Sequence, residues 1–314
     1  MIKERLIGYI EQSITQNWEI EALSNYKEKG MSYKEIAGKM LRMHIFFRDA
    51  GIREGDKIAL VGRNSANWCI TYLATVTYGA VIVPILPDFK PDDLANLVNH
   101  SDATLLFADD KLYESIDPAK IPQIIGVVSV DTFKLITAKD ESLKINFDSL
   151  EEKYLKAYPE LKKEDIKFSD ISNDKLAVIS YTGGTTGFSK GVMLSHNSLA
   201  ANVRYAQANM PLNPGDPLVS FLPLAHTYGC AFEFLFPFTY GCHITILSKT
   251  PSPQIIVQAF KEIRPRLVLS VPLVIEKIYK TKVLPTFTQK RTMRALYKNP
   301  FLRRTLNRAA GKKL

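Results

Sequence analysis

The sequence reads YTGGTTGFSKGVMLSH from residue 181 to residue 196. Apolar residues precede and follow its glycines, in LAVISY (176–181) and VML (192–194), and this pattern predicts two short strands joined by a tight loop. Glycines in such a loop can adopt positive φ angles, which lets backbone N–H groups point inward at an anion. The stretch therefore predicts a polyphosphate-binding loop between two strands.

Side chains of this loop add further donors for the same anion. Hydroxyl groups can donate hydrogen bonds to phosphate oxygens, and Lys190 supplies a positive point charge. An ordinary hairpin turn with a solvated lysine is the alternative, but the density and order of these residue types favour the phosphate site. The predicted phosphate-binding residues are Thr182, Gly183, Gly184, Thr185, Thr186, Gly187, Ser189 and Lys190.

The loop differs from the phosphate loop of the common ATPases and GTPases. There a Gly-Lys pair is followed by Ser or Thr and a helix begins at the lysine, whereas here Phe188 and Ser189 separate Gly187 from Lys190. The stretch instead resembles the glycine- and threonine-rich loop of the adenylate-forming superfamily, which includes acyl-CoA synthetases, luciferases and the adenylation domains of peptide synthetases. That family usually has Ser or Thr at the position of Gly183 and Pro at the position of Ser189.

The resemblance extends from about Tyr33 to about Tyr279. Three early stretches are similar to the opening blocks of acyl-CoA synthetases: MSYKEI (31–36), GIREGDKIALVGRNSANW (51–68) and YGAVIVPILPDF (78–89). Three later stretches are similar to the long-chain fatty-acyl branch: LPLAHTYG (222–229), FPFTYGCHITIL (236–247) and VPLVIEKIY (271–279).

The resemblance implies a two-step reaction. ATP and a fatty acid would give an acyl-adenylate and pyrophosphate, after which the thiol of CoA would take the acyl group. It implies Lys190, Thr186 and His226 as catalytic residues, with Thr186 beside a Mg²⁺ ion, because charge on the leaving pyrophosphate must be neutralised. His226, within LPLAHTYG, matches the His or aromatic position that the family places beside the nucleotide and the acyl group.

The block that begins at His226 also bears on the substrate. Amino-acid-activating relatives keep an aspartate there, whereas this chain reads HTYGCAFEFLFP. Apolar residues in it suit a fatty acyl chain, although a plain core helix would look the same: Cys230, Ala231, Phe232, Phe234 and Leu235. The alternatives are a ligase for another carboxylate such as an aromatic acid, transfer to an acyl carrier protein, or a nucleotide- or partner-binding fragment without catalysis.

Composition indicates a globular protein of 314 residues with 46% hydrophobic content. The N-terminus MIKERLIGYIEQ lacks the apolar core of a signal peptide, and the near-apolar stretch 230–240 is too short to span a membrane, so we expect a cytoplasmic protein. The sequence has three cysteines, at positions 69, 230 and 242, and this odd number argues against a disulfide framework. Their spacing does not match that of a metal site. We expect buried free thiols.

Positive charge gathers near the C-terminal end of the sequence. Residues 281–314 contain ten basic and no acidic side chains, so the formal net charge of +9 belongs to this segment. Few aromatic residues and no known motif accompany it, which argues against nucleic-acid binding. Two interpretations stay open. The segment can be a solvated helix that packs on a further part of the protein, or it can make peripheral contact with the inner face of an anionic membrane.

Apolar strands alternate with capped helices along the chain. Ser32 with Glu35 predicts the start of a helix that Gly51 ends, Asn64 is a candidate cap for the next helix, and Gly79 closes it. Pro91 predicts another helix start, and Asn299 with Pro300 predicts a short helix that carries Leu302, Leu306 and Ala310 on one face. Strands are predicted at 57–62, 80–86, 104–109, 218–222, 243–247 and 266–271.

These strands predict an α/β fold of mostly parallel sheets flanked by helices, the incomplete N-terminal domain of an adenylate-forming enzyme. We expect that domain over residues 1–280, with the phosphate loop at 181–191, and a basic helical segment over 281–314. Similar enzymes continue with a glycine-tyrosine-threonine-glutamate block, a ribose-binding aspartate, a hinge and a C-terminal lysine, none of which occurs between Tyr279 and Leu314. The resemblance therefore implies a missing C-terminal domain and an isolated fragment without activity.

Overall fold

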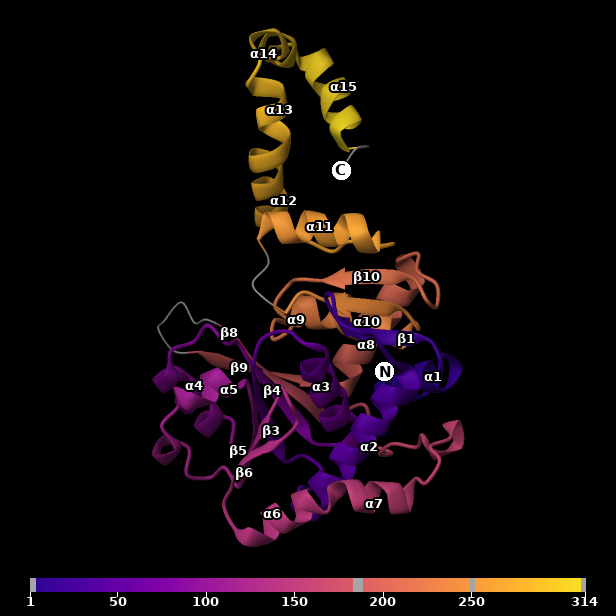
Figure 1. Cartoon of the computed structure of the whole chain (residues 1–314), viewed down its shortest axis with the longest axis vertical. Helices are drawn as coiled ribbons and strands as arrows, with labels where there is room; N and C mark the ends of the chain where they lie inside the picture. Colours follow the sequence, from indigo (N-terminus) through magenta and orange to yellow (C-terminus); the bar gives the residue numbers. More distant parts are fainter. Residues whose placement is uncertain (1–3, 183–188, 249–251, 312–314) are drawn as a thin grey trace. The chain divides into compact units, whose positions relative to one another are not determined.

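The computed structural model describes residues 4–182, 189–248 and 252–311. The chain forms two compact units (Figure 1). The first comprises Met1–Pro251 and Ala259–Val268, and the second comprises Ser252–Gln258 and Leu269–Leu314. The domain division expected from charge, 1–280 and 281–314, stays a prediction.

A seven-stranded sheet forms the centre of the first unit, in the order β7-β6-β5-β3-β4-β8-β9. Its strands are β3 (Lys57–Val61), β4 (Val81–Ile85), β5 (Ala103–Ala108), β6 (Gly126–Ser129), β7 (Leu135–Ala138), β8 (Leu176–Thr182) and β9 (Lys190–Ser195). The strands from β6 to β8 in this order are parallel to one another. The two edge strands are antiparallel to their neighbours, β7 to β6 and β9 to β8. The predicted α/β fold with mostly parallel sheets is confirmed.

The central strands are apolar on both faces because helices cover both faces. In β3, Ile58 and Leu60 belong to the core cluster that includes residues of α2 (Tyr33–Asp49) and α3 (Ala66–Tyr78). The alternate residues Ala59 and Val61 belong to the cluster that includes α4 (Pro91–His100). Figure 1 shows α3 on one side of the sheet, and α4 with α5 (Asp110–Glu114) on the other.

A second, four-stranded sheet has the order β10-β11-β1-β2. Its strands are β1 (Glu21–Asn25), β2 (Met31–Ser32), β10 (Pro217–Ser220) and β11 (His243–Ile246), and β1 is parallel to β11. The sequence did not predict β1, because EALSN has no alternating apolar pattern. Its Leu23 and Ser24 lie beside Ile244 and Thr245, so a pairing partner far along the chain makes this segment a strand.

Shorter elements complete both units. In the first unit these are α1 (Leu6–Gln16), η1 (Pro118–Lys120), α6 (Glu141–Asp148), α7 (Leu150–Ala157), η2 (Lys163–Asp165), α8 (His196–Asn209), α9 (Thr227–Gly229), the π-helical η3 (Cys230–Leu235) and α10 (Phe236–Thr239). Helix α11 (Pro253–Ile263) contributes residues to both units, and the second unit continues with α12 (Pro272–Ile278), the π-helical η4 (Tyr279–Val283), α13 (Leu284–Thr288), α14 (Arg291–Lys298) and α15 (Pro300–Gly311).

Local sequence signals determine several element boundaries. Ser32 and Glu35 form the predicted capping box of α2, Gly79 ends α3 in the left-handed conformation, and Pro91 is the first residue of α4. The predicted cap at Asn64 is wrong. Ser65 caps α3 instead and accepts a hydrogen bond from Trp68 N, which leaves the Asn64 side chain available for a distant contact.

The strand predicted at 266–271 is also wrong. Within the described residues, this run contributes a single bridge, between Leu267 and Leu218 of β10. The pattern assumed that the run is buried, but the side chain of Val268 is 40% exposed and the first unit ends at that residue. An apolar run without a covering layer does not become a core strand.

The second unit contains the predicted helix at Pro300, where α15 begins. Tyr297 of α14 stacks on Phe287 of α13 with ring centroids 5.2 Å apart, and its hydroxyl donates to Asn307 Oδ1 of α15 at 3.0 Å. The side chains of Arg303 and Arg304 are exposed. Across the ranges that the structure describes, no helix is long and apolar enough to cross a membrane. Contact of this segment with an anionic membrane stays a prediction.

We expect Gly79→Ala to lower the free energy of unfolding more than Gly215→Ala does. Both glycines have positive φ, 98° and 82°, so each alanine should cost about 1 to 2 kcal/mol in backbone strain. A Cβ at position 79 would also lie 2.1 Å from Ile171 Cδ1, whereas one at position 215 meets nothing within 4 Å. Urea unfolding of both variants measures the difference, expected at about 1 to 3 kcal/mol. Equal losses would contradict the packing of Ile171 on this helix end.

Candidate functional site

Strands β8 and β9 form the hairpin that the sequence predicted, with the glycine-rich loop between them. Thr182 is paired directly with Lys190, and Tyr181 with Gly191. Directly opposite residues of an antiparallel pair share one face, with Cβ atoms about 4.5 to 5.5 Å apart. The side chains of Thr182 and Lys190 therefore leave the sheet on the same face where the loop begins and ends, and both residues are exposed.

Of the other predicted phosphate-binding residues, the structure places only Ser189. It directly precedes Lys190 and is half-buried. The remaining ones, Gly183, Gly184, Thr185, Thr186 and Gly187, lie outside the described residues. The proposed contact of Thr186 with magnesium therefore stays a prediction.

Tyr181 holds the end of strand β8 in place, next to Thr182. Its side chain is buried, and its hydroxyl lies 2.7 Å from His100 Nδ1 at the end of α4. Burial, with a smaller contribution from the negative charge of Asp102, raises the pKa of Tyr181 to about 12, so the phenol stays protonated. The start of the loop is thus attached to the helix layer on one face of the sheet.

The segment that carries His226 lies after β10, and a buried carboxylate holds its start. Glu233 Oε2 accepts hydrogen bonds from the backbone N–H groups of Phe221 and Leu222, both at 2.9 Å, and from the Ser220 hydroxyl at 3.1 Å. The other oxygen of Glu233 is buried with no hydrogen-bond partner among the described residues. Burial raises the pKa of Glu233 to about 7 and outweighs the three donors, which act to lower it.

Asn64 holds the same segment from the opposite direction. Its amide Nδ2 donates to the Leu222 carbonyl at 2.7 Å, and its Oδ1 accepts from the Leu224 N–H at 3.0 Å. The Asn64 side chain therefore satisfies one backbone carbonyl and one backbone N–H group of residues 222–224, which pair with no strand. This contact explains the wrong capping prediction, because the amide is used here and not at the start of α3.

His226 follows residues 221–224, which Glu233 and Asn64 hold, and its side chain is exposed. It precedes α9 at the N-cap position but makes no side-chain capping bond, and the described residues provide no hydrogen bond or ion pair to its ring. The ring is thus available to a ligand, but its predicted catalytic role stays a prediction.

The apolar residues after His226 divide into two groups. Phe234 and Leu235 are core residues, and Phe234 packs against Trp68 and Tyr72 with ring centroids 6.3 Å and 5.7 Å apart. For these two, the plain core interpretation is correct. Cys230 and Ala231 are buried as well, and they also line a cavity of about 30 Å³.

This cavity connects the two motifs. Its lining combines residues of β8 and β9 (Val178, Ser180, Leu194) with α8 (Leu199, Asn202), with Tyr72 and Pro84, and with the segment after β10 (Leu224, Ala225, Thr227, Cys230, Ala231). A space of about 30 Å³ holds little more than one water molecule, so an acyl chain would have to open it. The strand that leads to the glycine-rich loop is therefore adjacent to the segment that carries His226.

The cysteines and the other histidines belong to the fold. Cys69, Cys230 and Cys242 are free and buried as predicted, and burial raises the pKa of Cys230 to about 12, which favours the protonated thiol near neutral pH. Burial lowers the pKa of His44 and of His196 to about 4. Among the described residues, no group of three or more His, Cys, Asp or Glu side chains could hold a metal ion.

Similar proteins are known for most of this chain. The sequence profile described as AMP-binding enzyme matches residues 10–311. The chain belongs to this family. Its similar relatives include a probable acyl-activating enzyme 16 of Arabidopsis thaliana, 27% identical over 79% of this chain and 35% of that protein. They also include long chain acyl-CoA synthetase 4 of the same plant, 27% identical over 79% of this chain and 38% of that protein. The predicted resemblance to the adenylate-forming superfamily is confirmed.

Solved structures show the same fold. A long-chain-fatty-acid-CoA ligase of Archaeoglobus fulgidus matches with a TM-score of 0.72 and 22% identity, over 89% of this chain and 54% of that one. The N-terminal domain of FACL13 from Mycobacterium tuberculosis matches with a TM-score of 0.71 and 17% identity, over 89% and 66%. The chain spans about a third of the length of the curated AMP-binding relatives, 35% and 38% for the two named above.

The sequence did not predict the roles of Asn64 and Glu233. A glutamate inside the apolar run CAFEFLF was a usable signal, because a carboxylate is almost never fully buried without hydrogen-bond partners. Asn64 gave no comparable signal, since asparagine before a helix is an ordinary cap.

We expect Glu233→Gln to remove part of the pH dependence of stability. The pKa of this carboxyl lies above its ordinary 4.5 in the folded protein, at about 7, so the native state binds the proton more tightly and stability falls as pH rises from about 4.5 to about 7. The shift corresponds to about 3 kcal/mol. Urea unfolding at pH 5 and pH 7.5 should show a smaller decline for the variant.

Glu160→Gln is the control, because Glu160 is exposed. It should keep the pH dependence of the unchanged protein. If Glu233→Gln gives the same pH dependence as the control, the carboxyl is not desolvated as described.

Proposed function

We propose that this protein activates a fatty acid with ATP to an acyl-adenylate and passes the acyl group to the thiol of CoA. The observation that carries the proposal is the hairpin in which Thr182 and Lys190 lie opposite each other at the ends of the glycine-rich loop. Membership of the AMP-binding enzyme family supports the adenylate step, and the names of its relatives support an acyl-CoA ligase.

In this proposal the hairpin holds the phosphates of ATP. Lys190 supplies the full positive charge, Thr182 and Ser189 supply hydroxyl donors, and the loop between them supplies backbone N–H groups and Thr185 and Thr186. The donor set fits an anion, because Thr182 and Ser189 offer neutral hydroxyl donors and the ion pairs within the described residues do not involve Lys190. A Mg²⁺ ion near Thr186 would add charge neutralisation on the leaving pyrophosphate.

The acyl group would lie beside β8, on the side of His226. Cys230 and Ala231 offer apolar surface in the cavity next to Val178 and Ser180, and the exposed His226 precedes them in the same segment. The hydrogen bonds of Asn64 and Glu233 would keep that segment in position while the cavity opens.

Other acceptors and acids remain alternatives. One relative, from Arabidopsis thaliana, is a long-chain-fatty-acid--[acyl-carrier-protein] ligase, 26% identical to this chain, which keeps transfer to a carrier protein open. A nucleotide- or partner-binding fragment without catalysis is the other alternative.

We expect Lys190→Ala, introduced into the full-length protein, to slow adenylate formation at least tenfold. A hydrogen bond to a charged group is worth about 1.5 to 3 kcal/mol, which corresponds to about ten- to a hundredfold. Fatty-acid-dependent exchange between pyrophosphate and ATP measures the step. Lys175→Ala is the matched control, because Lys175 directly precedes β8 at the end remote from the loop and is exposed. An unchanged exchange rate in Lys190→Ala would falsify the assignment of the hairpin to phosphate binding.

We expect medium and long fatty acids, and no amino acid, to support this exchange. Each buried methylene contributes about 0.8 kcal/mol, so affinity should rise with chain length until the site is full. Ala231→Phe should reduce exchange with palmitate more than exchange with butyrate, because Ala231 lines the cavity beside β8. The control Ala208→Phe lies on an exposed position of α8 and should leave the ratio unchanged. A preference for acetate or for an amino acid would refute the fatty-acid assignment.

A further inference from the structure

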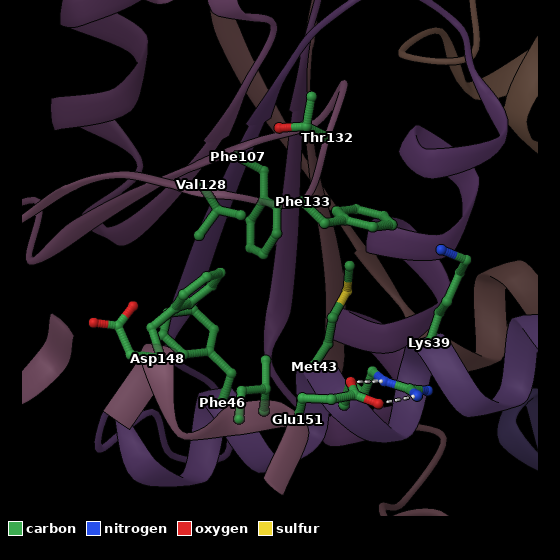
Figure 2. A pocket seen from close by; sticks show the side chains of 12 residues that line it. Lys39, Met43, Phe46, Phe107, Val128, Thr132, Phe133, Asp148 and Glu151 are labelled. Carbon is green, nitrogen blue, oxygen red and sulfur yellow. Dashed lines mark hydrogen bonds and ion pairs between the residues drawn. The ribbon is translucent and has the colours of Figure 1, made fainter. Parts of the chain in front are cut away.

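A second, roomier cavity lies on the part of the sheet remote from the hairpin. It has a volume of about 290 Å³ and opens between α2, the β5–β6 region and the α6–α7 pair (Figure 2). Its lining includes Lys39, Phe46, Phe107, Val128, Phe133 and Phe147. Its size is close to the lower limit of ordinary small-molecule sites, about 300 Å³.

Four of its lining residues are phenylalanines. Phe46 and Phe107 are buried at its base, and Phe147 meets Phe46 edge to face with ring centroids 5.1 Å apart. Phe133 also lines the cavity, as Figure 2 shows. Rings fixed in this way present a rigid apolar surface that needs no hydrogen bonds, which suits an apolar ligand body.

The charged residues at the rim are not equivalent. Arg42 donates to both carboxylate oxygens of Glu151, at 2.7 Å and 2.8 Å, and its guanidinium group stacks on the Tyr154 ring at 3.5 Å. These two charges therefore neutralise each other. The carboxylate of Asp148 points away from the rings in Figure 2.

Lys39 is the lining cation that lacks a carboxylate within 4.0 Å among the described residues. Its ammonium group lies 5.5 Å from the centre of the Phe133 ring. Burial, followed by the positive charge of Arg42, lowers the pKa of Lys39, and the carboxylate of Glu35 offsets this only in part. A half-buried ammonium group without a counter-ion is a costly arrangement that a ligand anion would relieve.

We propose that this cavity binds an amphipathic monocarboxylate, with its apolar body among the phenylalanine rings and its carboxylate at Lys39. The site is separate from the proposed phosphate site and does not depend on it. The cavity contacts β5 and β6, whereas the glycine-rich loop follows β8, and β3 and β4 lie between β5 and β8. At about 4.8 Å per strand, the two sites are roughly 14 Å or more apart.

Calorimetric titration of this chain with octanoate, and in parallel with uncharged octan-1-ol, tests the proposal. Octanoate should bind more tightly than octanol, and Lys39→Gln should weaken octanoate about tenfold while leaving octanol unchanged. Lys34→Gln is the matched control, because Lys34 lies on the same helix, also over an aromatic ring, that of Trp18 at 5.9 Å, and does not line the cavity. This control should bind octanoate like the unchanged chain.

A second variant tests the apolar part of the cavity. Val128→Phe places a ring in the cavity and should abolish the binding of both octanoate and octanol, with thermal unfolding followed by circular dichroism to show that the variant folds. Octanoate binding that is insensitive to Lys39→Gln, or that equals octanol binding, overturns the proposal. Loss of octanoate binding in Ala231→Phe but not in Lys39→Gln would place the acid in the cavity beside β8, which keeps the two proposals distinguishable.

Discussion

Strand β8 joins the seven-stranded sheet by parallel pairing with β4, with Val178 beside Ile82. The site depends on this pairing. A two-stranded hairpin alone is at best marginally stable in water, so β8 and β9 could not hold the ends of a glycine-rich loop in a fixed position without the sheet behind them. Strand β8 also lies beside the segment after β10. The evidence is the cavity that Val178 and Ser180 line together with Ala225 and Cys230.

Two polar side chains, those of Glu233 and Asn64, hold the segment that carries His226. The segment after β10 has no ladder partner, and its backbone groups are satisfied by Glu233 on one side and by Asn64 on the other. Burial of the Glu233 carboxyl is unfavourable in itself, as its raised pKa shows. The three hydrogen bonds that Glu233 accepts offset part of this cost and hold the segment in position.

Local signals made part of this fold predictable. The capping box at Ser32 and Glu35, the left-handed Gly79 and the apolar runs of β3 to β5 each depend on neighbours in sequence, and the structure contains all of them. Strand β1 could not be predicted, because only its distant pairing with β11 makes EALSN extended. The candidate site shows the same contrast: the hairpin follows from its glycines and flanking apolar residues, whereas the contact between Asn64 and Leu224 joins residues 160 positions apart.

The central claim is that the β8–β9 hairpin binds the phosphates of a nucleotide. Hydrogen–deuterium exchange of the full-length protein, measured by mass spectrometry with and without ATP and magnesium, tests it most directly. Backbone N–H groups that hold phosphate exchange more slowly, so peptides that cover residues 182–190 should be protected by ATP, while peptides from α6 and α7 should not change. Unchanged exchange in 182–190 at saturating ATP, with protection elsewhere, would contradict the claim.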